Sequence, residues 1–413
     1  MRTTLALGLA GFVAAPAVAG VMLLGCGDAA SRPAIGPVED AEAGPAPDAG
    51  TEDASEADAR PPFDAAAPEI ACAVTPCMTR LVSGPTHYCA IANDGVVRCW
   101  GNPSALGKFA GPNPNGDPGA TPVVLEGIGD VVDIGASALR TCVAHADGNV
   151  DCFGRDTPKP TRVPGISGAK KLAIGDERSC AIGAGDVLSC WGDSRSTGEG
   201  SGSVALGAEP AVAAAVSVPA GFAVDAAGAL FSWGADELML GRDTPLEVDL
   251  MPGRVESLPP VLQIAASDRH ACAVTSDGRL YCWGHGDDGA LGLGSIRSVS
   301  VPTEVLFPGP ASPAQVAVAL THSCVRMTDG SVSCWARKNA FGELGYGDVT
   351  GVFIPTRVTL ANKVAAVATG TGSTCVLATD GSVACWGDNT YGQLGLGRRD
   401  AQRHWAPTTV VFP

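Results

Sequence analysis

The sequence has no amphipathic stretch long enough to predict a major helix, and it is short of positive charge. Its 413 residues include 27 Lys and Arg against 43 Asp and Glu, a formal net charge of −16. Phosphate binding needs a concentrated basic face, so we expect no binding of nucleic acid. The absence of helices, together with 54 glycines and 31 prolines, favours an all-β fold with many turns.

Motifs for catalysis and cofactor binding are also missing. The sequence shows no nucleophile motif, no metalloprotease helix and no obvious carboxylate pair. Its Gly-x-x-Gly segments lack the Lys-Ser/Thr and the strand-to-helix context of a phosphate-binding loop. Cysteines spaced by two residues, as in zinc knuckles, do not occur. We therefore expect neither enzyme activity nor a cofactor.

Cysteine is plentiful, and twelve of the fifteen cysteines form pairs ten residues apart. Most pairs are centred on Asp-Gly, as at Asp277-Gly278. Asp-Gly between apolar runs predicts a β-hairpin, and a three-residue loop would bring the two cysteines within disulfide reach. Metal binding is the alternative. The predicted disulfides are Cys89–Cys99, Cys142–Cys152, Cys180–Cys190, Cys272–Cys282, Cys324–Cys334 and Cys375–Cys385.

A seventh copy of this frame, around Phe222 and Ser232, has lost both cysteines together. The joint loss suggests that the two positions depend on each other. Of the remaining cysteines, Cys72 and Cys77 can close on each other, which leaves only Cys26. Complete pairing of the others is expected in an oxidising compartment.

The N-terminal residues 1–25 have the features of an export signal, with Arg2 as their only charge and a long apolar stretch. The stretch ends Leu-Leu-Gly-Cys, which resembles the lipobox of bacterial lipoproteins and implies that Cys26 is acylated. Leu24 departs from the small residue usual at its position. Cleavage after Ala19, which would give a secreted protein, and a retained transmembrane anchor are the alternatives.

Residues 26–70 form the next segment, which follows the predicted acylation site. Residues 27–70 contain eleven acidic residues against two arginines, among Ala, Pro, Gly and Ser. Such a segment cannot bury enough apolar surface to offset its ordering entropy. We expect a disordered, self-repelling tether.

Residues 71–413 contain seven copies of one unit. An aromatic residue follows each second-cysteine position, at Trp100, Phe153, Trp191, Trp233, Trp283, Trp335 and Trp386. A period near 50 residues with strand-type patterning favours a propeller or a solenoid. Around several hairpins lie a β-branched run, a glycine-leucine loop and a proline-bearing strand, although repeats two to four are degraded and repeat two lacks the loop. Four short strands per unit are typical of a propeller blade.

These repeats resemble the regulator of chromosome condensation repeat, which is marked by His, Asp-Gly, Trp-Gly and Gly-Gln-Leu-Gly. The last copy reads Asp380-Gly381, Trp386-Gly387 and Gly392-Gln393-Leu394-Gly395. The resemblance covers about residues 79–413 and implies a seven-bladed β-propeller. Because the first repeat lacks its own proline strand, we expect residues 407–411 to complete the first blade and close the ring.

Candidate site residues are few. His87, His270 and His322 each stand two residues before a hairpin cysteine, and this recurrence suggests a structural hydrogen bond. Two cationic loops are candidates for partner binding, since Arg and Trp are common interface anchors. Their residues are Arg337, Lys338, Arg398, Arg399, Arg403, His404 and Trp405.

The expected function is that of a non-catalytic, lipid-anchored protein of the outer membrane or cell surface, with secretion or a periplasmic location as alternatives. Its propeller would be monomeric, touch the membrane only through the lipid, and bind a protein or glycan on its loops. One alternative is an extracellular inhibitor of the propeller-type β-lactamase inhibitor kind. Others are guanine-nucleotide exchange, by resemblance, and an enzyme with a site in the channel.

Overall fold

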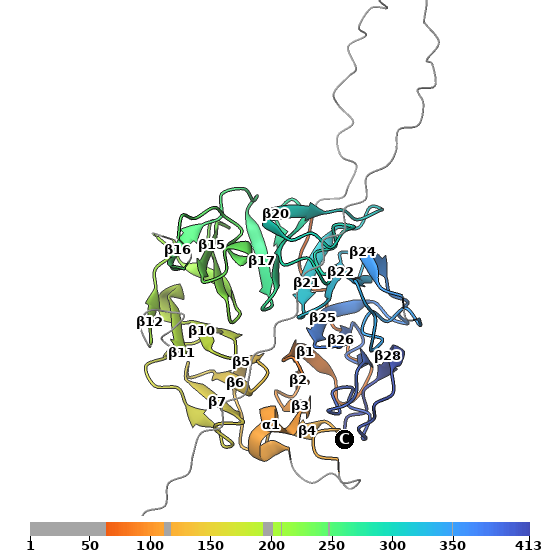
Figure 1. The fold of residues 1–413 in the computed structure, drawn as a ribbon. Coiled ribbons are helices and arrows are strands. Elements are labelled where there is room, and N and C mark those ends of the chain that lie inside the picture. The colour runs from red at the N-terminus through yellow and green to blue at the C-terminus, as the bar shows by residue number, and fades with distance from the viewer. Residues whose placement is uncertain (1–62, 111–116, 193–200, 208, 247, 349) are drawn as a thin grey trace, which may run out of the picture. The chain divides into compact units, whose positions relative to one another are not determined.

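The computed structural model describes residues 63–110, 117–192, 201–207, 209–246, 248–348 and 350–413. The predicted signal segment, Cys26 and most of the predicted tether lie outside these ranges. The described residues belong to one compact unit, Asp58–Pro413. They form seven four-stranded antiparallel sheets, the blades, arranged in a ring (Figure 1). The prediction of an all-β, seven-bladed propeller is confirmed.

Each blade is built from four strands that are consecutive in the sequence. Blades 1 to 4 comprise β1 (Met78–Ser83), β2 (His87–Ala92), β3 (Val97–Gly101) and β4 (Val123–Val124); β5 (Val131–Ala136), β6 (Arg140–His145), β7 (Val150–Gly154) and β8 (Thr161–Arg162); β9 (Lys171–Ile174), β10 (Arg178–Ile182), β11 (Leu188–Gly192) and β12 (Ser201–Val204); and β13 (Ala211–Val216), β14 (Ala220–Asp225), β15 (Leu230–Gly234) and β16 (Asp249–Arg254).

The remaining blades and the helices complete the described chain. Blades 5 to 7 comprise β17 (Val261–Ala266), β18 (His270–Thr275), β19 (Leu280–Gly284) and β20 (Val299–Val305); β21 (Pro313–Val318), β22 (Ser323–Met327), β23 (Val332–Ala336) and β24 (Val352–Arg357); and β25 (Val364–Gly370), β26 (Ser373–Ala378), β27 (Val383–Gly387) and β28 (His404–Thr409). The helices are α1 (Pro103–Leu106), η1 (Gly107–Phe109), η2 (Ala184–Asp186) and α2 (Glu237–Leu240). Among the described residues, no helix has the length and apolarity to cross a membrane.

The hairpins have the predicted geometry. In blade 1, Ala92 and Val96 flank a three-residue loop, and the Gly95 N–H donates to the Ala92 carbonyl at 2.9 Å. Gly95 has φ of 77°, a left-handed conformation that glycine adopts without strain. The register pairs the two cysteines of each of the six hairpins, with Cα atoms 4.0–4.1 Å apart. Phe222 and Ser232 occupy the same register in blade 4.

The apolar core is distributed over the junctions between blades. In blade 5, Cys272 and Val274 share a cluster with Trp335 of blade 6. The alternate positions face the other way, and Trp283 packs edge-on against Phe222 of blade 4. Alternation along each strand therefore makes one face of a blade pack on the next blade and the other face on the preceding blade.

Three buried histidines bond neighbouring blades to each other. His270 Nε2 lies 2.7 Å from Ser323 Oγ of the next blade, and that hydroxyl donates to the Ala290 carbonyl at 2.8 Å. Because the hydroxyl proton is already used, Nε2 must carry the donated hydrogen. His87 with Thr141 and His322 with Thr374 repeat the arrangement. The predicted structural role of these histidines is confirmed.

Burial controls the protonation of the same histidines. It lowers the pKa of His87 and His322 to about 4. Burial, with smaller repulsion from His322 and Arg269, lowers the pKa of His270 to about 3. All three imidazoles are therefore neutral at physiological pH, as their single-donor hydrogen bonds require.

Closure of the ring differs from the prediction. Blade 1 is complete with β1 to β4, and β28 is the fourth strand of blade 7, where Thr408 pairs with Cys385. The prediction that residues 407–411 complete the first blade is wrong. The loop after Trp386 leads back to its own blade, because short connections favour antiparallel pairing with the nearest strand. The proline strand therefore ends each repeat and does not begin the next.

The N-terminal segment 63–77 crosses the ends of several blades. The Ala71 N–H donates to the Thr379 carbonyl at 2.8 Å, and the Met78 N–H donates to the Gly381 carbonyl at 2.9 Å. Arg326 Nη2 donates to the Ala65 carbonyl at 3.3 Å. Residues 63–70, which the sequence assigns to the tether, thus contact the ring.

Candidate binding face

All seven blades present the same kinds of connection at each end of the ring. The first and third strands of a blade both run toward one end, which carries a short turn after the first strand and a long loop after the third. We call this end the loop face. The Asp-Gly turns lie at the opposite end, the turn face. Both predicted cationic loops follow a third strand, so they belong to the loop face.

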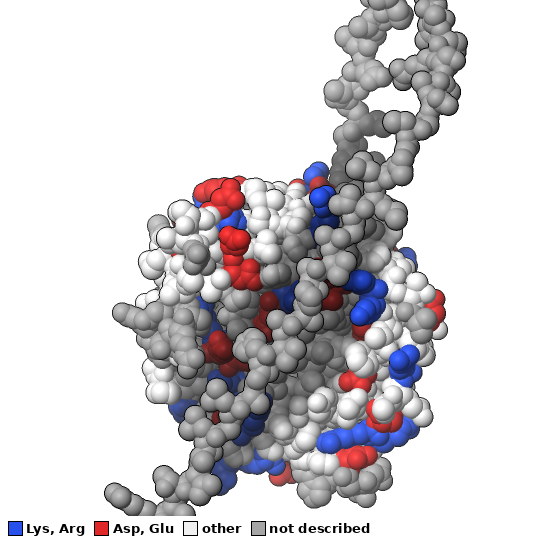
Figure 2. Space-filling view, viewed as in Figure 1, with Lys and Arg blue, Asp and Glu red and all other residues white. Residues whose placement is uncertain are grey.

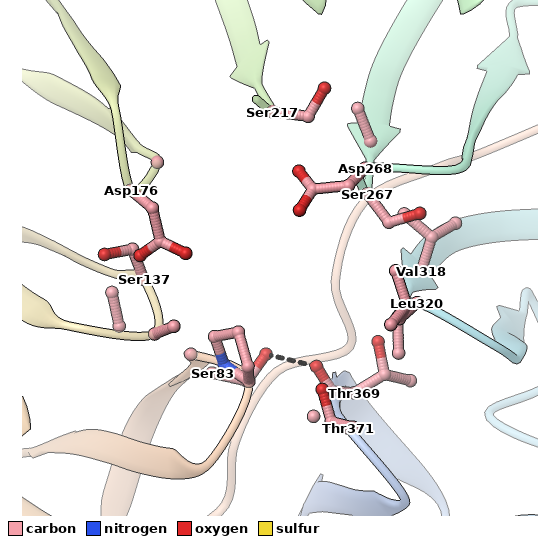
Figure 3. Close-up of a pocket in the computed structure, with 18 of the residues that line it drawn as sticks. Ser83, Ser137, Asp176, Ser217, Ser267, Asp268, Val318, Leu320, Thr369 and Thr371 are labelled. Atoms are coloured by element: carbon pink, nitrogen blue, oxygen red, sulfur yellow. Dashed lines mark hydrogen bonds between the residues drawn. The ribbon is translucent and has the colours of Figure 1, made fainter. Parts of the chain in front are cut away.

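The central channel opens on the loop face in a cavity of about 320 Å³, which we call the mouth (Figure 3). The turns that follow the first strands of all seven blades line it. The lining combines six hydroxyls with two carboxylates, from Ser83, Ser137, Ser217, Ser267, Thr369, Thr371, Asp176 and Asp268. Figure 2 shows acidic side chains near the centre of this face.

Two lining groups from neighbouring blades have polar atoms that the described residues do not satisfy. Ser137 is only 5% exposed, and neither its Oγ nor Asp176 Oδ1 has a hydrogen-bond partner among the described residues. Across the mouth, Asp268 accepts a hydrogen bond from the Val218 N–H at 2.9 Å. Buried polar atoms normally have partners. The mouth therefore offers acceptor oxygens to a ligand that carries N–H or O–H donors, such as an ammonium group or sugar hydroxyls.

The mouth is chemically suited to binding. Its lining contains no histidine, cysteine or lysine, and its ionisable side chains are those of Asp176 and Asp268. Within the described part of the chain, no group of three or more His, Cys, Asp or Glu side chains is arranged to hold a metal ion. The arrangement can hold a ligand by hydrogen bonds and by charge.

The first predicted cationic loop, Arg337-Lys338, lies over the neighbouring blade 5. The Arg337 N–H donates to the Asp288 carbonyl at 2.6 Å, and its Nη1 donates to the Asp287 carbonyl at 3.3 Å. Both side chains are exposed. Arg337 therefore contributes to the contact between blades 5 and 6, while Lys338 remains a candidate for partner binding.

The second predicted cationic loop is largely engaged within the molecule. Arg399 donates from Nη2 to the Pro118 carbonyl of blade 1, across the junction where the ring closes. Arg398 and His404 both contact Asp400, at 3.1 and 2.9 Å. Burial raises the pKa of Asp400, but the hydrogen bond from His404 and that from Asn389 lower it more. Arg398, Arg399 and His404 thus stabilise the loop.

Arg403 at the end of this loop contacts Trp405 at the start of β28. The Arg403 guanidinium lies 5.7 Å from the centre of the Trp405 ring, within the range of a cation–π contact. Arg403 is exposed and Trp405 is half-buried. Of the seven predicted partner-binding residues, Lys338, Arg403 and Trp405 remain the candidates for contact with another molecule.

Sequence reasoning missed the mouth. Ser137, Asp176 and Asp268 belong to short turns that share no common residue type, and only the circular arrangement brings them together. The available signal was the position of these residues in the repeat. Each lies four or five residues before the first cysteine of its hairpin, in the turn that leads into the second strand. Recognition of that position as the channel rim would have found them.

Two family models that describe the regulator of chromosome condensation (RCC1) repeat match the chain. One matches residues 227–274, 277–326 and 380–413, and the other matches residues 261–290 and 364–393. These segments lie in blades 4 to 7.

Curated relatives share part of the chain. The ultraviolet-B receptor UVR8 of Arabidopsis thaliana is 30% identical over 278 residues, which cover 62% of this chain and 62% of the receptor. The E3 ubiquitin-protein ligase HERC2 of Mus musculus is 31% identical over 185 residues, which cover 43% of this chain and 4% of the ligase. The chain therefore spans less than two thirds of the length of these relatives.

Solved structures share the fold. Yeast RCC1 (Prp20), solved with Kap60 bound, has a TM-score of 0.67 at 20% identity, over 82% of this chain and 85% of that chain. Human WBSCR16 has a TM-score of 0.67 at 18% identity, over 77% of this chain and 95% of that chain. At such identities the likeness shows the fold alone.

Proposed function

The chain is a seven-bladed β-propeller that carries RCC1 repeats, and from this premise we propose that it is a non-catalytic protein of the cell envelope that binds a protein or glycan on its loop face. The observation that carries the proposal is the mouth, where hydroxyl and carboxylate acceptor groups from several blades meet in one cavity. Prp20p of Saccharomyces cerevisiae is described with binding properties to Gsp1p and histones, and this supports a protein partner by analogy.

The cysteines support an exported location. Fourteen of them lie in seven pairs at disulfide distance, and such pairs persist in oxidising compartments. Cys26 is the remaining cysteine. We propose that residues 1–25 direct export, that an acyl chain on Cys26 anchors a monomer to the membrane, and that residues 26–70 tether the propeller of residues 71–413.

Affinity capture tests the binding proposal. Residues 27–413, which lack the acylation site, are immobilised and exposed to secreted and envelope proteins and to surface glycans of the cell that makes the chain. The variant D176N/D268N neutralises two carboxylates of the mouth. The matched control E126Q/E256Q neutralises two carboxylates in the connections that precede β5 and β17, on the turn face.

The expected result is a partner that the parent chain and the turn-face control retain and that the mouth variant loses. Equal capture by both variants would show that the loop-face mouth is not the site. If no partner is captured, and the chain instead hydrolyses a polysaccharide or an ester, the binding proposal is wrong.

A further inference from the structure

One contact recurs between neighbouring blades. At five junctions, the long loop of one blade presents a backbone carbonyl and then a leucine to the next blade. The five leucines are at most 1% exposed. The carbonyl–leucine pairs are Ala105-Leu106, Met239-Leu240, Ala290-Leu291, Glu343-Leu344 and Gln393-Leu394.

At two of the five junctions, two side-chain donors on the receiving blade bind this carbonyl. Where blade 5 meets blade 6, the Ala290 carbonyl accepts from Trp335 Nε1 and from Ser323 Oγ, both at 2.8 Å. Where blade 6 meets blade 7, the Glu343 carbonyl accepts from Trp386 Nε1 and Thr374 Oγ1, also at 2.8 Å. At these two junctions the receiving site is an indole N–H beside a hydroxyl, with an apolar pocket for leucine.

Blade 3 carries both donors. Ser179 pairs with Trp191 across the hairpin, in the same register in which Ser323 pairs with Trp335. The loop of blade 2, residues 155–160, contains no leucine. It turns toward blade 1, where the Pro158 carbonyl accepts from the Lys108 N–H at 2.7 Å.

The donors of blade 3 therefore lack their usual acceptor. Among the described residues, none accepts a hydrogen bond from the Trp191 indole, and Ser179 Oγ donates at 3.4 Å to the Gly175 carbonyl of its own blade. A recess of about 230 Å³ remains, lined by Trp191, Cys152, Val163 and Arg140 among others. We call it the vacant recess.

The exposed fractions of the residues that line the recess also indicate that no leucine of the described chain fills it. Trp191 is 8% exposed and Cys152 is 9% exposed. At the filled junction of blades 5 and 6, the corresponding residues Trp335 and Cys282 are both 0% exposed. Apolar surface that a leucine covers elsewhere in the ring is open here, although the residues around it are of the same kind.

We propose that the vacant recess binds a leucine-bearing reverse turn of a partner protein. The carbonyl before the leucine accepts hydrogen bonds from Trp191 Nε1 and Ser179 Oγ, and the leucine side chain packs on Cys152 and Val163. Arg140, at the rim, supplies a further donor. The inference deepens the proposed function, on which it rests for the existence of a partner, because the turns that line the recess belong to the loop face.

The chain supplies its own probe, the peptide Asn-Thr-Tyr-Gly-Gln-Leu-Gly-Leu-Gly of residues 389–397. It is titrated into the full chain while the indole N–H signals of the seven tryptophans are followed by NMR. The Trp191 signal is expected to move and to saturate. A peptide with Ala in place of the first leucine is expected to bind at least about tenfold more weakly, since it loses most of the buried side chain.

Protein variants locate the site. W191F keeps an aromatic side chain at this position but removes the indole N–H donor. It is therefore expected to weaken peptide binding about threefold to tenfold. W283F is the matched control, because Trp283 Nε1 already donates to the Met239 carbonyl at 2.7 Å. It should leave peptide affinity unchanged. The remaining indole signals show whether each variant is folded.

Three results would overturn the inference. The Trp191 signal could stay in place at millimolar peptide, or both peptides could bind equally. The Trp191 N–H could also exchange with water as slowly as that of Trp335 in the free chain, which would mean that the chain fills the recess itself. None of these results alters the outcome of the capture experiment with the mouth variants. Failure of the recess proposal can therefore be distinguished from failure of the proposed binding function.

Discussion

The three buried histidines predict that the propeller loses stability in mild acid. Their folded pKa values are about 4 for His87 and His322 and about 3 for His270, below the ordinary value of 6.5. As the pH falls below 6.5, the unfolded chain binds protons that the folded chain does not, so the free energy of unfolding decreases until the folded pKa is reached. At about 1.4 kcal/mol per pKa unit, each histidine removes on the order of 3 kcal/mol.

The variant H322Q tests this reasoning at one histidine. A Gln amide can still donate to Thr374 Oγ1, but it does not titrate. The free energy of unfolding is measured by urea denaturation between pH 7.5 and pH 4.5, roughly the window that the pKa values define. The decrease across this window should be smaller in H322Q than in the parent chain, by about 2.5 kcal/mol at pH 4.5.

The variant T374V is the control for the lost hydrogen bond. It removes the hydroxyl that His322 contacts at 3.0 Å and keeps the buried imidazole. T374V should be less stable than the parent chain at every pH and should retain the parent's pH dependence. If H322Q and the parent chain give parallel curves, burial of a neutral His322 does not contribute to the acid sensitivity.

Three further predictions concern the anchor, the hairpins and the blade junctions. C26A should move the chain from the membrane to the soluble fraction, and mass spectrometry of the mature N-terminus should show acylation only in the parent. Replacing Cys375 and Cys385 together by alanine should lower the free energy of unfolding by about 2–3 kcal/mol, because the closed loop is short; reductant should then cause a smaller loss than in the parent. Q315L should cost about 1–3 kcal/mol in urea denaturation, since Gln315 bonds both the N–H and the carbonyl of Val367 in the next blade.

The hairpins could be predicted from the sequence because their geometry is local. An Asp-Gly turn and two cysteines ten residues apart determine which residues face each other, and the observed register of Cys272 with Cys282 follows from that spacing. The alternation that sends Val274 and Trp283 to different junctions is equally local. Seven copies of such a unit were enough to indicate the number of blades.

The loops and the mouth could not be predicted in the same way. Helices α1 and α2 present Leu106 and Leu240 to the next blade as the glycine-leucine loops do, but their sequences differ from the motif. The shared signal was a leucine followed by glycine, at Gly107 and Gly241. The mouth depends on distances between turns that lie far apart in the sequence, so the sequence places its residues at one rim only once the ring arrangement is known.

Ring closure gives a last prediction, because the junction of blades 7 and 1 uses the same contact as the other junctions. Trp100 Nε1 donates to the Gln393 carbonyl at 3.0 Å, as Trp335 Nε1 donates to Ala290. Ala290 also accepts from Ser323, whereas blade 1 has Tyr88 at that position, and its hydroxyl contacts Ser373.

W100F should therefore destabilise the ring by about 1–3 kcal/mol, and W335F by less, because Ala290 keeps its second donor. Urea denaturation at neutral pH compares the two variants. If a C-terminal strand completed the first blade and so closed the ring, the Trp100 hydrogen bond would be dispensable. W100F would then be as stable as the parent chain. If side chains and loops close the ring, W100F should lower the free energy of unfolding at least as much as W335F does.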